Sequence, residues 1–161
     1  MNEDPLDKLD SRIIEALEAN GRITFDELAS RIGLSPSATL RRVKRLEESG
    51  VIAGYAALVS PESLGLALTA YLNVRLAKHL GDEASSPIDA FAAAVQAWPE
   101  VVECVALTGD MDYLLHVRVR DMQHYSRFVL DRLLRHPTVQ DCKTSFMLRR
   151  LKPSKPSPKA T

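Results

Sequence analysis

The sequence predicts an α+β protein that combines an N-terminal three-helix helix-turn-helix domain with a C-terminal ferredoxin-like βαββαβ domain. Within the first 50 residues, apolar residues recur at helical spacing in three short segments, and a tight glycine turn joins the last two. From residue 68 onward, strand and helix periodicities alternate in the order β-α-β-β-α-β. The predicted divisions are 1–50 for the first domain, 51–66 for a linking strand and turn, 67–150 for the second domain and 151–161 for a disordered tail.

Composition limits the class of protein. The chain has 161 residues and a formal net charge of +0, so we do not expect it to bind polyanions over its whole surface. Its two cysteines, Cys104 and Cys142, lack the spacing of metal ligands or of a disulfide framework, and we expect no metal or other cofactor. No apolar run approaches membrane-spanning length, and the N-terminus is acidic, unlike a signal peptide. These features predict a cytoplasmic protein that does not contact the membrane.

The first two helices are expected from their end signals. Asp4-Pro5 combines a favoured N-cap with a proline, and an Asn-Gly pair at residues 20–21 is a standard helix stop. A capping-box pattern, T-x-x-E at residues 24–27, predicts a second helix over 25–32. Gly33 ends that helix, and a tight turn leads directly into the third.

The third helix, over residues 36–49, has the strongest functional signal. Ser35 is a favoured N-cap, and Leu40, Val43 and Leu46 form one apolar stripe. An isolated cationic helix face is usually only a solvated surface. A cationic helix that follows another helix and a tight turn, however, is typical of the helix that enters the major groove of DNA. The candidate DNA-contacting residues are Ser35, Ser37, Thr39, Arg41, Arg42, Lys44 and Arg45.

The linking segment changes periodicity. Residues 51–59 have the pattern of a strand interrupted by Gly54, and we expect this strand to pair with a second subunit. Ser60-Pro61 then predicts a single helical turn that Gly65 stops. In the second domain, the alternation that starts at Leu68 predicts a first strand, followed by a helix over 86–98, strands over 101–108 and 113–119, a helix over 121–136 and a last strand over 139–148.

One face of the predicted sheet has no helix over it and mixes apolar with hydrogen-bonding side chains. A monomer would leave this broad face exposed to water. We therefore expect two sheets to pack face to face in a symmetric dimer, although a solvated sheet face is the simpler alternative. The residues on this face are Tyr71, Asn73, Arg75, Leu114, His116 and Arg118.

The turn from Thr108 to Tyr113 places two carboxylates beside a glycine. This cluster suits a metal ion, an acid–base pair or an ammonium group, whereas a hydrophilic hairpin turn needs no ligand. Metal binding is disfavoured because no histidine or further carboxylate lies nearby at ligand spacing. Nucleophilic catalysis is disfavoured because the chain has no Gly-x-Ser-x-Gly elbow and no Cys/His arrangement. The residues alone leave the ligand and the plain-turn interpretations open.

The chain resembles the Lrp/AsnC family of feast/famine transcription regulators in four segments: LDKLDSRIIEALEANGRITFDELASRIGLS, PSATLRRVKRLEESGVIAGYAALVSPESLG, WPEVVECVALTGDMDYLLHV and HPTVQDCKTSFMLRRLK. The resemblance implies a C-terminal domain of the RAM type and dimers that assemble further, commonly to octamers. It also implies palindromic DNA sites near promoters and an amino-acid effector bound between dimers. Carried onto this chain, the effector residues are Gly109, Asp110, Asp112 and Tyr113, with Thr144 and Ser145 expected to complete the pocket.

We therefore predict a sequence-specific DNA-binding transcriptional regulator, not an enzyme, whose assembly or DNA binding responds to an amino acid. Two other functions remain open. One is an architectural DNA-binding protein without an effector. The other is an enzyme subunit similar to siroheme decarboxylases, which resemble the same family. That function would need a cationic, histidine-bearing pocket, and His116 and Arg118 are the only close pair of this kind on the predicted sheet.

Overall fold

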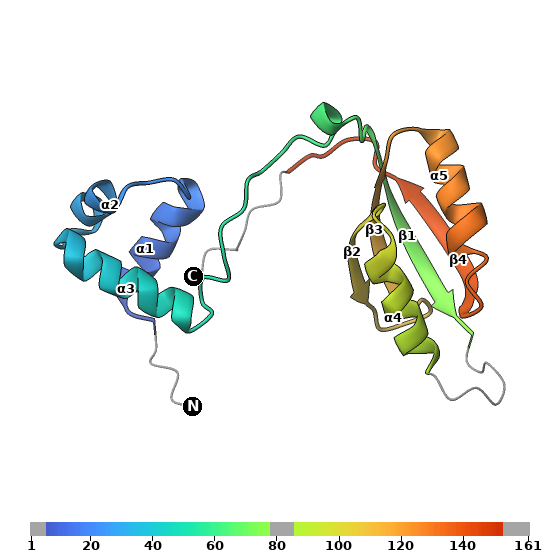
Figure 1. The fold of residues 1–161 in the computed structure, drawn as a ribbon, viewed down its shortest axis with the longest axis horizontal. Coiled ribbons are helices and arrows are strands. Elements are labelled where there is room, and N and C mark those ends of the chain that lie inside the picture. The colour runs from blue at the N-terminus through green and yellow to red at the C-terminus, as the bar shows by residue number, and fades with distance from the viewer. Residues whose placement is uncertain (1–5, 78–85, 153–161) are drawn as a thin grey trace. The chain divides into compact units, whose positions relative to one another are not determined.

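The computed structural model describes residues 6–77 and 86–152. The chain forms two compact units that divide between Leu58 and Val59, inside the predicted linking segment. The first unit holds three helices, and the second holds a four-stranded sheet with helices on one face (Figure 1). Each unit has its own hydrophobic core. Among the described residues, every helix is too short or too polar to span a lipid bilayer.

The helices of the first unit are α1 (Lys8–Ala19), α2 (Phe25–Ile32) and α3 (Pro36–Glu48). The capping box predicted for α2 is present, and Gly33 follows it with a φ of 77°. The predicted start of α1 is wrong. Its N-cap is Asp7, whose carboxylate accepts hydrogen bonds from the amides of Leu9 and Asp10, and Asp4-Pro5 lies outside the described residues.

The buried stripe of α3 differs from the predicted one. Val43 and Leu46 are buried as expected, but the third member is Thr39, which is fully buried, while Leu40 is 37% exposed. The Thr39 hydroxyl donates a hydrogen bond of 3.0 Å to the Ser35 carbonyl one turn earlier. This bond satisfies the hydroxyl inside the core, so a threonine occupies a position where the apolar pattern favoured leucine.

The predicted strand over residues 51–59 is absent from the single chain. These residues follow an irregular, extended path, because no neighbouring strand offers them backbone hydrogen bonds. Tyr55 attaches this segment to the first unit, since its hydroxyl donates a 2.9 Å hydrogen bond to the Glu47 carboxylate. The short helix η1 (Glu62–Leu64) follows, and Gly65 stops it as predicted. Pairing of 51–59 with a second copy stays a prediction.

The second unit contains β1 (Leu68–Leu76), α4 (Pro87–Ala97), β2 (Val101–Ala106), β3 (Tyr113–Val119), α5 (Met122–Phe128), the π-helical turn η2 (Val129–Leu133) and β4 (Val139–Phe146). All pairings are antiparallel, and the strand order is β2-β3-β1-β4. This is the predicted ferredoxin-like topology. The strands β2 and β4 each end two residues earlier than predicted, and the helix after Asp121 widens into η2 before it ends.

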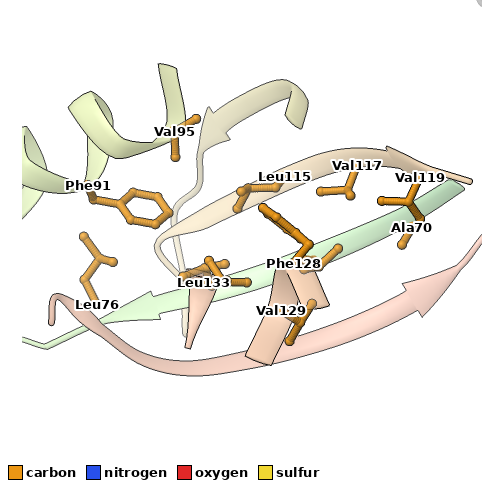
Figure 2. Packing of buried hydrophobic residues seen from close by; sticks show 12 residues of the cluster. Ala70, Leu76, Phe91, Val95, Leu115, Val117, Val119, Phe128, Val129 and Leu133 are labelled. Atoms are coloured by element: carbon orange, nitrogen blue, oxygen red, sulfur yellow. The ribbon is translucent and has the colours of Figure 1, made fainter. Parts of the chain in front are cut away.

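The core of this unit lies between one face of the sheet and the helices (Figure 2). Phe91 of α4 and Phe128 of α5 pack onto it, and both are almost completely buried. The alternation predicted for β1 is confirmed: Ala70, Leu72 and Val74 are fully buried, while the residues between them lie on the face without helices. Burying these side chains contributes on the order of 1.5–3 kcal/mol for each large residue. The fold therefore positions two features for function: the outer face of α3 and the edge of the sheet near the β2–β3 turn.

Candidate functional sites

The exposed face of α3 presents two cations. Ser37, Leu40, Arg41 and Lys44 are all exposed, and their spacing places them on one side of the helix. Neither Arg41 nor Lys44 has a hydrogen-bond or ion-pair partner among residues 6–77 and 86–152. Ser35 caps the helix, accepting a hydrogen bond of 3.3 Å from the Ala38 amide. This side of α3 thus combines small polar groups with unpaired positive charge.

The other two arginines of α3 contact α1. Arg42 Nη1 lies 2.7 Å from Asp7 Oδ2 and 2.8 Å from Asp10 Oδ1. Arg45 pairs with the second carboxylate oxygen of Asp10, which is completely buried. The Asp10 amide and the Arg42 guanidinium hold the pKa of Asp7 below its ordinary value. Arg42 and Arg45 therefore connect α3 to α1; the Arg42 side chain is 25% exposed and the Arg45 side chain 47%.

The seven predicted DNA-contacting residues consequently separate into three groups. Ser37, Arg41 and Lys44 lie on the exposed face, together with the capping residue Ser35. Arg42 and Arg45 hold the helix in place. Thr39 is a correction, because its complete burial in this structure keeps it away from any duplex. Asp7 and Asp10 were missed by the sequence argument, although their D-x-x-D spacing is that of the capping box they form.

A cleft of about 1070 Å³ lies in the second unit beside the β2–β3 turn. Its volume is slightly above the roughly 300–1,000 Å³ typical of small-molecule sites. Gly109 has a φ of 116°, a conformation that favours glycine, and thereby allows the tight turn. Four of the predicted effector residues line the cleft: Gly109, Asp110, Asp112 and Tyr113. The end of β1, the start of α4 and β4 contribute further lining residues: Arg75, Leu76, Ala77, Ser86, Pro87, Ile88 and Gln140.

The two carboxylates of the turn have different environments. Asp112 Oδ2 accepts a hydrogen bond of 2.7 Å from the Leu76 amide, and the Asp112 amide donates to the Val74 carbonyl at 2.9 Å. Asp110 is exposed, and its carboxylate accepts no hydrogen bond from any described residue. Its backbone carbonyl instead accepts a 2.9 Å hydrogen bond from Arg75 Nε. Asp112 therefore fixes the turn against β1, and Asp110 leaves a charged group available in the cleft.

The remaining predicted effector residues lie in different places. Tyr113 packs its ring against Phe91 at a centroid distance of 5.1 Å, and burial raises the pKa of its hydroxyl. Thr144 Oγ1 lies 2.6 Å from the Tyr125 hydroxyl, on the side of the sheet that carries the helices. Ser145 stands opposite Tyr71 in the register and is exposed. Neither Thr144 nor Ser145 lines the cleft of this chain, and their part in an effector site between dimers stays a prediction.

On the helix-free face, Tyr71 of β1 stacks on His116 of β3 with ring centroids 5.0 Å apart. His116 Nε2 and Arg118 Nε are buried without a hydrogen-bond partner among the described residues. Burial, then the charge of Arg118, lowers the pKa of His116. Neither residue lines the cleft beside the β2–β3 turn. No group of three His, Cys, Asp or Glu in the described parts of the chain is placed to hold a metal ion.

Comparisons with known proteins match a different family profile to each of two parts of the chain. The profile of the Lrp/AsnC ligand binding domain matches residues 69–157, and a profile described as winged helix-turn-helix DNA-binding matches residues 6–53. The leucine-responsive regulatory protein of Haemophilus influenzae is 41% identical over 147 residues, covering 91% of this chain and 86% of that protein.

Two solved structures are also similar. The transcriptional regulator NMB0573 of Neisseria meningitidis, in complex with L-methionine, superimposes with a TM-score of 0.89 at 47% identity, covering 96% of this chain and 97% of that one. The feast or famine regulatory protein Rv3291c of M. tuberculosis, also complexed with L-methionine, superimposes with a TM-score of 0.82 at 33% identity, covering 95% and 99%.

Proposed function

Because the chain belongs to the Lrp/AsnC family of transcription regulators, with a helix-turn-helix DNA-binding domain and a ligand-binding domain, we propose how its two sites work together. The exposed face of α3 binds palindromic promoter sites in double-stranded DNA. An amino acid in the cleft beside the β2–β3 turn controls that binding. The protein acts in the cytoplasm by binding, without catalysis.

The DNA-binding part of the proposal rests on one observation. Two of the four cations of α3 pair with Asp10, and the other two have no partner among the described residues. Arg41 and Lys44 have no partner among the described residues and lie on the same side as Ser37. An arginine can bind guanine with two hydrogen bonds, and a lysine contacts phosphate as a point charge. Arg42 and Arg45, paired with buried Asp10, keep α3 at a fixed angle to α1. A two-fold dimer would present two such helices, which matches a palindromic site.

The effector part is supported by the cleft and by the relatives. Two similar structures hold L-methionine, and we propose L-methionine or a similar amino acid as the effector of this chain. The effector can change DNA binding only if it binds one assembly state more tightly than another. We propose that dimers form through the helix-free sheet faces and associate further, up to octamers, and that the effector shifts this equilibrium.

A selection from a random duplex pool tests the function directly. The full chain is expected to enrich a palindromic sequence, and addition of L-methionine is expected to change its affinity for the enriched duplex or its sedimentation on it. An architectural protein would instead retain all duplexes equally and ignore the amino acid. Equal retention of every duplex by the folded protein would overturn the proposal.

A further inference from the structure

The cleft carries two opposite charges that are not paired with each other. Arg75 Nε donates to the backbone carbonyl of Asp110, and Arg75 Nη2 lies 3.8 Å from the Met111 sulfur. No carboxylate within the described parts of the chain lies within ion-pair distance of Arg75. Asp141 faces Arg75 across the strand pair, but its Oδ1 accepts a hydrogen bond from the Cys142 amide.

Arg75 is therefore held at Nε and more weakly at Nη2, and its remaining N–H groups can bind a ligand. A guanidinium has five N–H donors; the Asp110 carbonyl and the Met111 sulfur each use one of them. Because the side chain lines the cleft, these donors are within reach of a molecule bound there. An anchored guanidinium is well suited to hold a carboxylate through two parallel hydrogen bonds.

Asp110 supplies the opposite charge. Of the two carboxylates in the turn, that of Asp112 accepts a hydrogen bond from the Leu76 amide, whereas that of Asp110 is exposed in the cleft and has no hydrogen-bond donor among the described residues. A bound zwitterion would neutralise both Arg75 and Asp110. A ligand with only one charge would leave the other charge without a partner.

The walls of the cleft indicate the rest of the ligand. Ile88 in the first turn of α4 is 57% exposed, and Leu107 at the end of β2 is 40% exposed. Ala77 also lines the cleft. Covering these apolar surfaces is favourable by roughly 25 cal/mol for each Å² removed from water, so an apolar side chain fits there better than a polar one.

We propose that Arg75 binds the α-carboxylate and Asp110 the α-ammonium group of a free amino acid with an apolar side chain. This assignment rests on the proposed effector function. It makes Arg75, which lies outside the Gly-Asp-x-Asp-Tyr turn, a determinant of ligand class. It also separates the turn's carboxylates into a ligand-binding residue, Asp110, and a residue that fixes the backbone, Asp112.

Isothermal titration of the full chain with three probes tests the assignment. L-Methionine has both charges, L-methioninamide lacks the carboxylate, and 4-(methylthio)butanoate lacks the ammonium group. The wild type should bind L-methionine about 10- to 100-fold more tightly than either analogue, as expected for one lost charge-assisted contact. L-Leucine, L-leucinamide and 4-methylpentanoate are measured in parallel, because a similar protein is leucine-responsive.

The variants should change selectivity, which loss of stability alone does not do. Arg75→Gln should bind L-methionine and L-methioninamide within about threefold of each other while it still discriminates against 4-(methylthio)butanoate. Asp110→Asn should bind L-methionine and 4-(methylthio)butanoate within about threefold of each other while it still discriminates against L-methioninamide. Arg120→Gln, an exposed arginine that does not line the cleft, should keep both preferences.

Two results would overturn the assignment, and they are distinguishable. If Arg75→Gln weakens L-methionine and L-methioninamide by the same factor, Arg75 only holds the turn, and the proposed effector function survives. If the wild type binds no amino acid of either series, the effector function and the assignment fail together.

Discussion

The carboxylate of Asp10 in α1 lies 2.8 Å from Arg42 Nη1 in α3 and accepts a second bond from Arg45. A completely buried acid in the first helix thus neutralises two of the four cations of α3, the helix proposed to contact DNA. Through this contact, α1 sets the orientation of α3. Changes at this contact should therefore act on the stability of the first unit, whereas changes at the outward cations should act on DNA.

Asp10→Ala should destabilise the first unit. Breaking a buried ion pair costs about 3–5 kcal/mol, and because both arginines are partly exposed, the expected loss is about 2–3 kcal/mol. Denaturant unfolding followed by far-UV circular dichroism measures this loss. Trp98, the single tryptophan, lies in the second unit, so its fluorescence transition should not move. Asp26→Ala, an exposed acid in α2, should change stability by less than about 0.5 kcal/mol.

Arg41→Ala and Lys44→Ala should weaken DNA binding without unfolding the protein. Each removed cation that contacts phosphate should reduce the slope of log K against log salt by about 1. Binding is measured by fluorescence anisotropy on the selected duplex at several salt concentrations, with Arg135→Ala, a cation of the second unit, as the control. Unchanged affinity and slope in both variants would exclude this face of α3 from the interface.

Arg42→Ala should also weaken DNA binding, but together with the stability of the first unit. The guanidinium that it removes connects α3 to Asp7 and Asp10, so the loss of affinity should accompany an earlier helix unfolding transition. A variant with normal stability and reduced affinity would show instead that Arg42 contacts the duplex directly.

Asp112→Ala should disturb the β2–β3 turn itself. Without the carboxylate, the partly buried Leu76 amide loses its hydrogen-bond partner, which costs about 1–3 kcal/mol. Asp112→Asn keeps an acceptor oxygen and should be close to wild type in stability, and Asp110→Ala should be nearly neutral. Thermal unfolding followed by Trp98 fluorescence compares the three. Equal stability of Asp112→Ala and the wild type would contradict a structural role for this carboxylate.

Leu114→Asp should break the proposed dimer. Leu114 stands opposite Asn73 on the helix-free face, where a face-to-face dimer would bury a charge without a partner. Sedimentation velocity should show a shift toward the mass of a single chain. Gln123→Asp, at an exposed position of α5, should leave the assembly as it is. A dimer that persists in Leu114→Asp would exclude this face as the interface.

Stability of the second unit should fall as the pH drops below about 6.5. Burial lowers the pKa of His116 and of His136 from the ordinary value of 6.5, so the unfolded chain takes up protons in this range that the folded chain does not. Among the charges near His116, Arg118 and Arg150 lower its pKa further, and Glu103 opposes them. Thermal unfolding by Trp98 fluorescence between pH 7.5 and 5.5 should show a smaller decline in His116→Gln, and an identical decline would contradict this origin.

Local patterns in the sequence determined the secondary structure and topology of this protein. The caps at Thr24 and Ser35, the alternation along β1 and the stop at Gly65 depend on neighbours within a few residues, and all appear as predicted. Residues 51–59 form no strand within one chain because a strand needs a partner strand, and their pairing with a second copy stays a prediction. The start of α1 was wrong because the capping box that Asp7 forms with Asp10 places the N-cap three residues after Asp4.

Tertiary structure decided what each charged residue does. The four cations of α3 look equivalent in sequence, yet Arg42 and Arg45 contact Asp10 whereas Arg41 and Lys44 have no partner among the described residues. Thr39, in the same helix, is completely buried. In the same way, contacts with β1 distinguish two aspartates that stand two positions apart in the turn. The ion pair between Asp10 and Arg42 and the hydrogen bond between Arg75 and Asp110 each connect residues more than 30 positions apart. Their distances are fixed only by the tertiary packing of each unit.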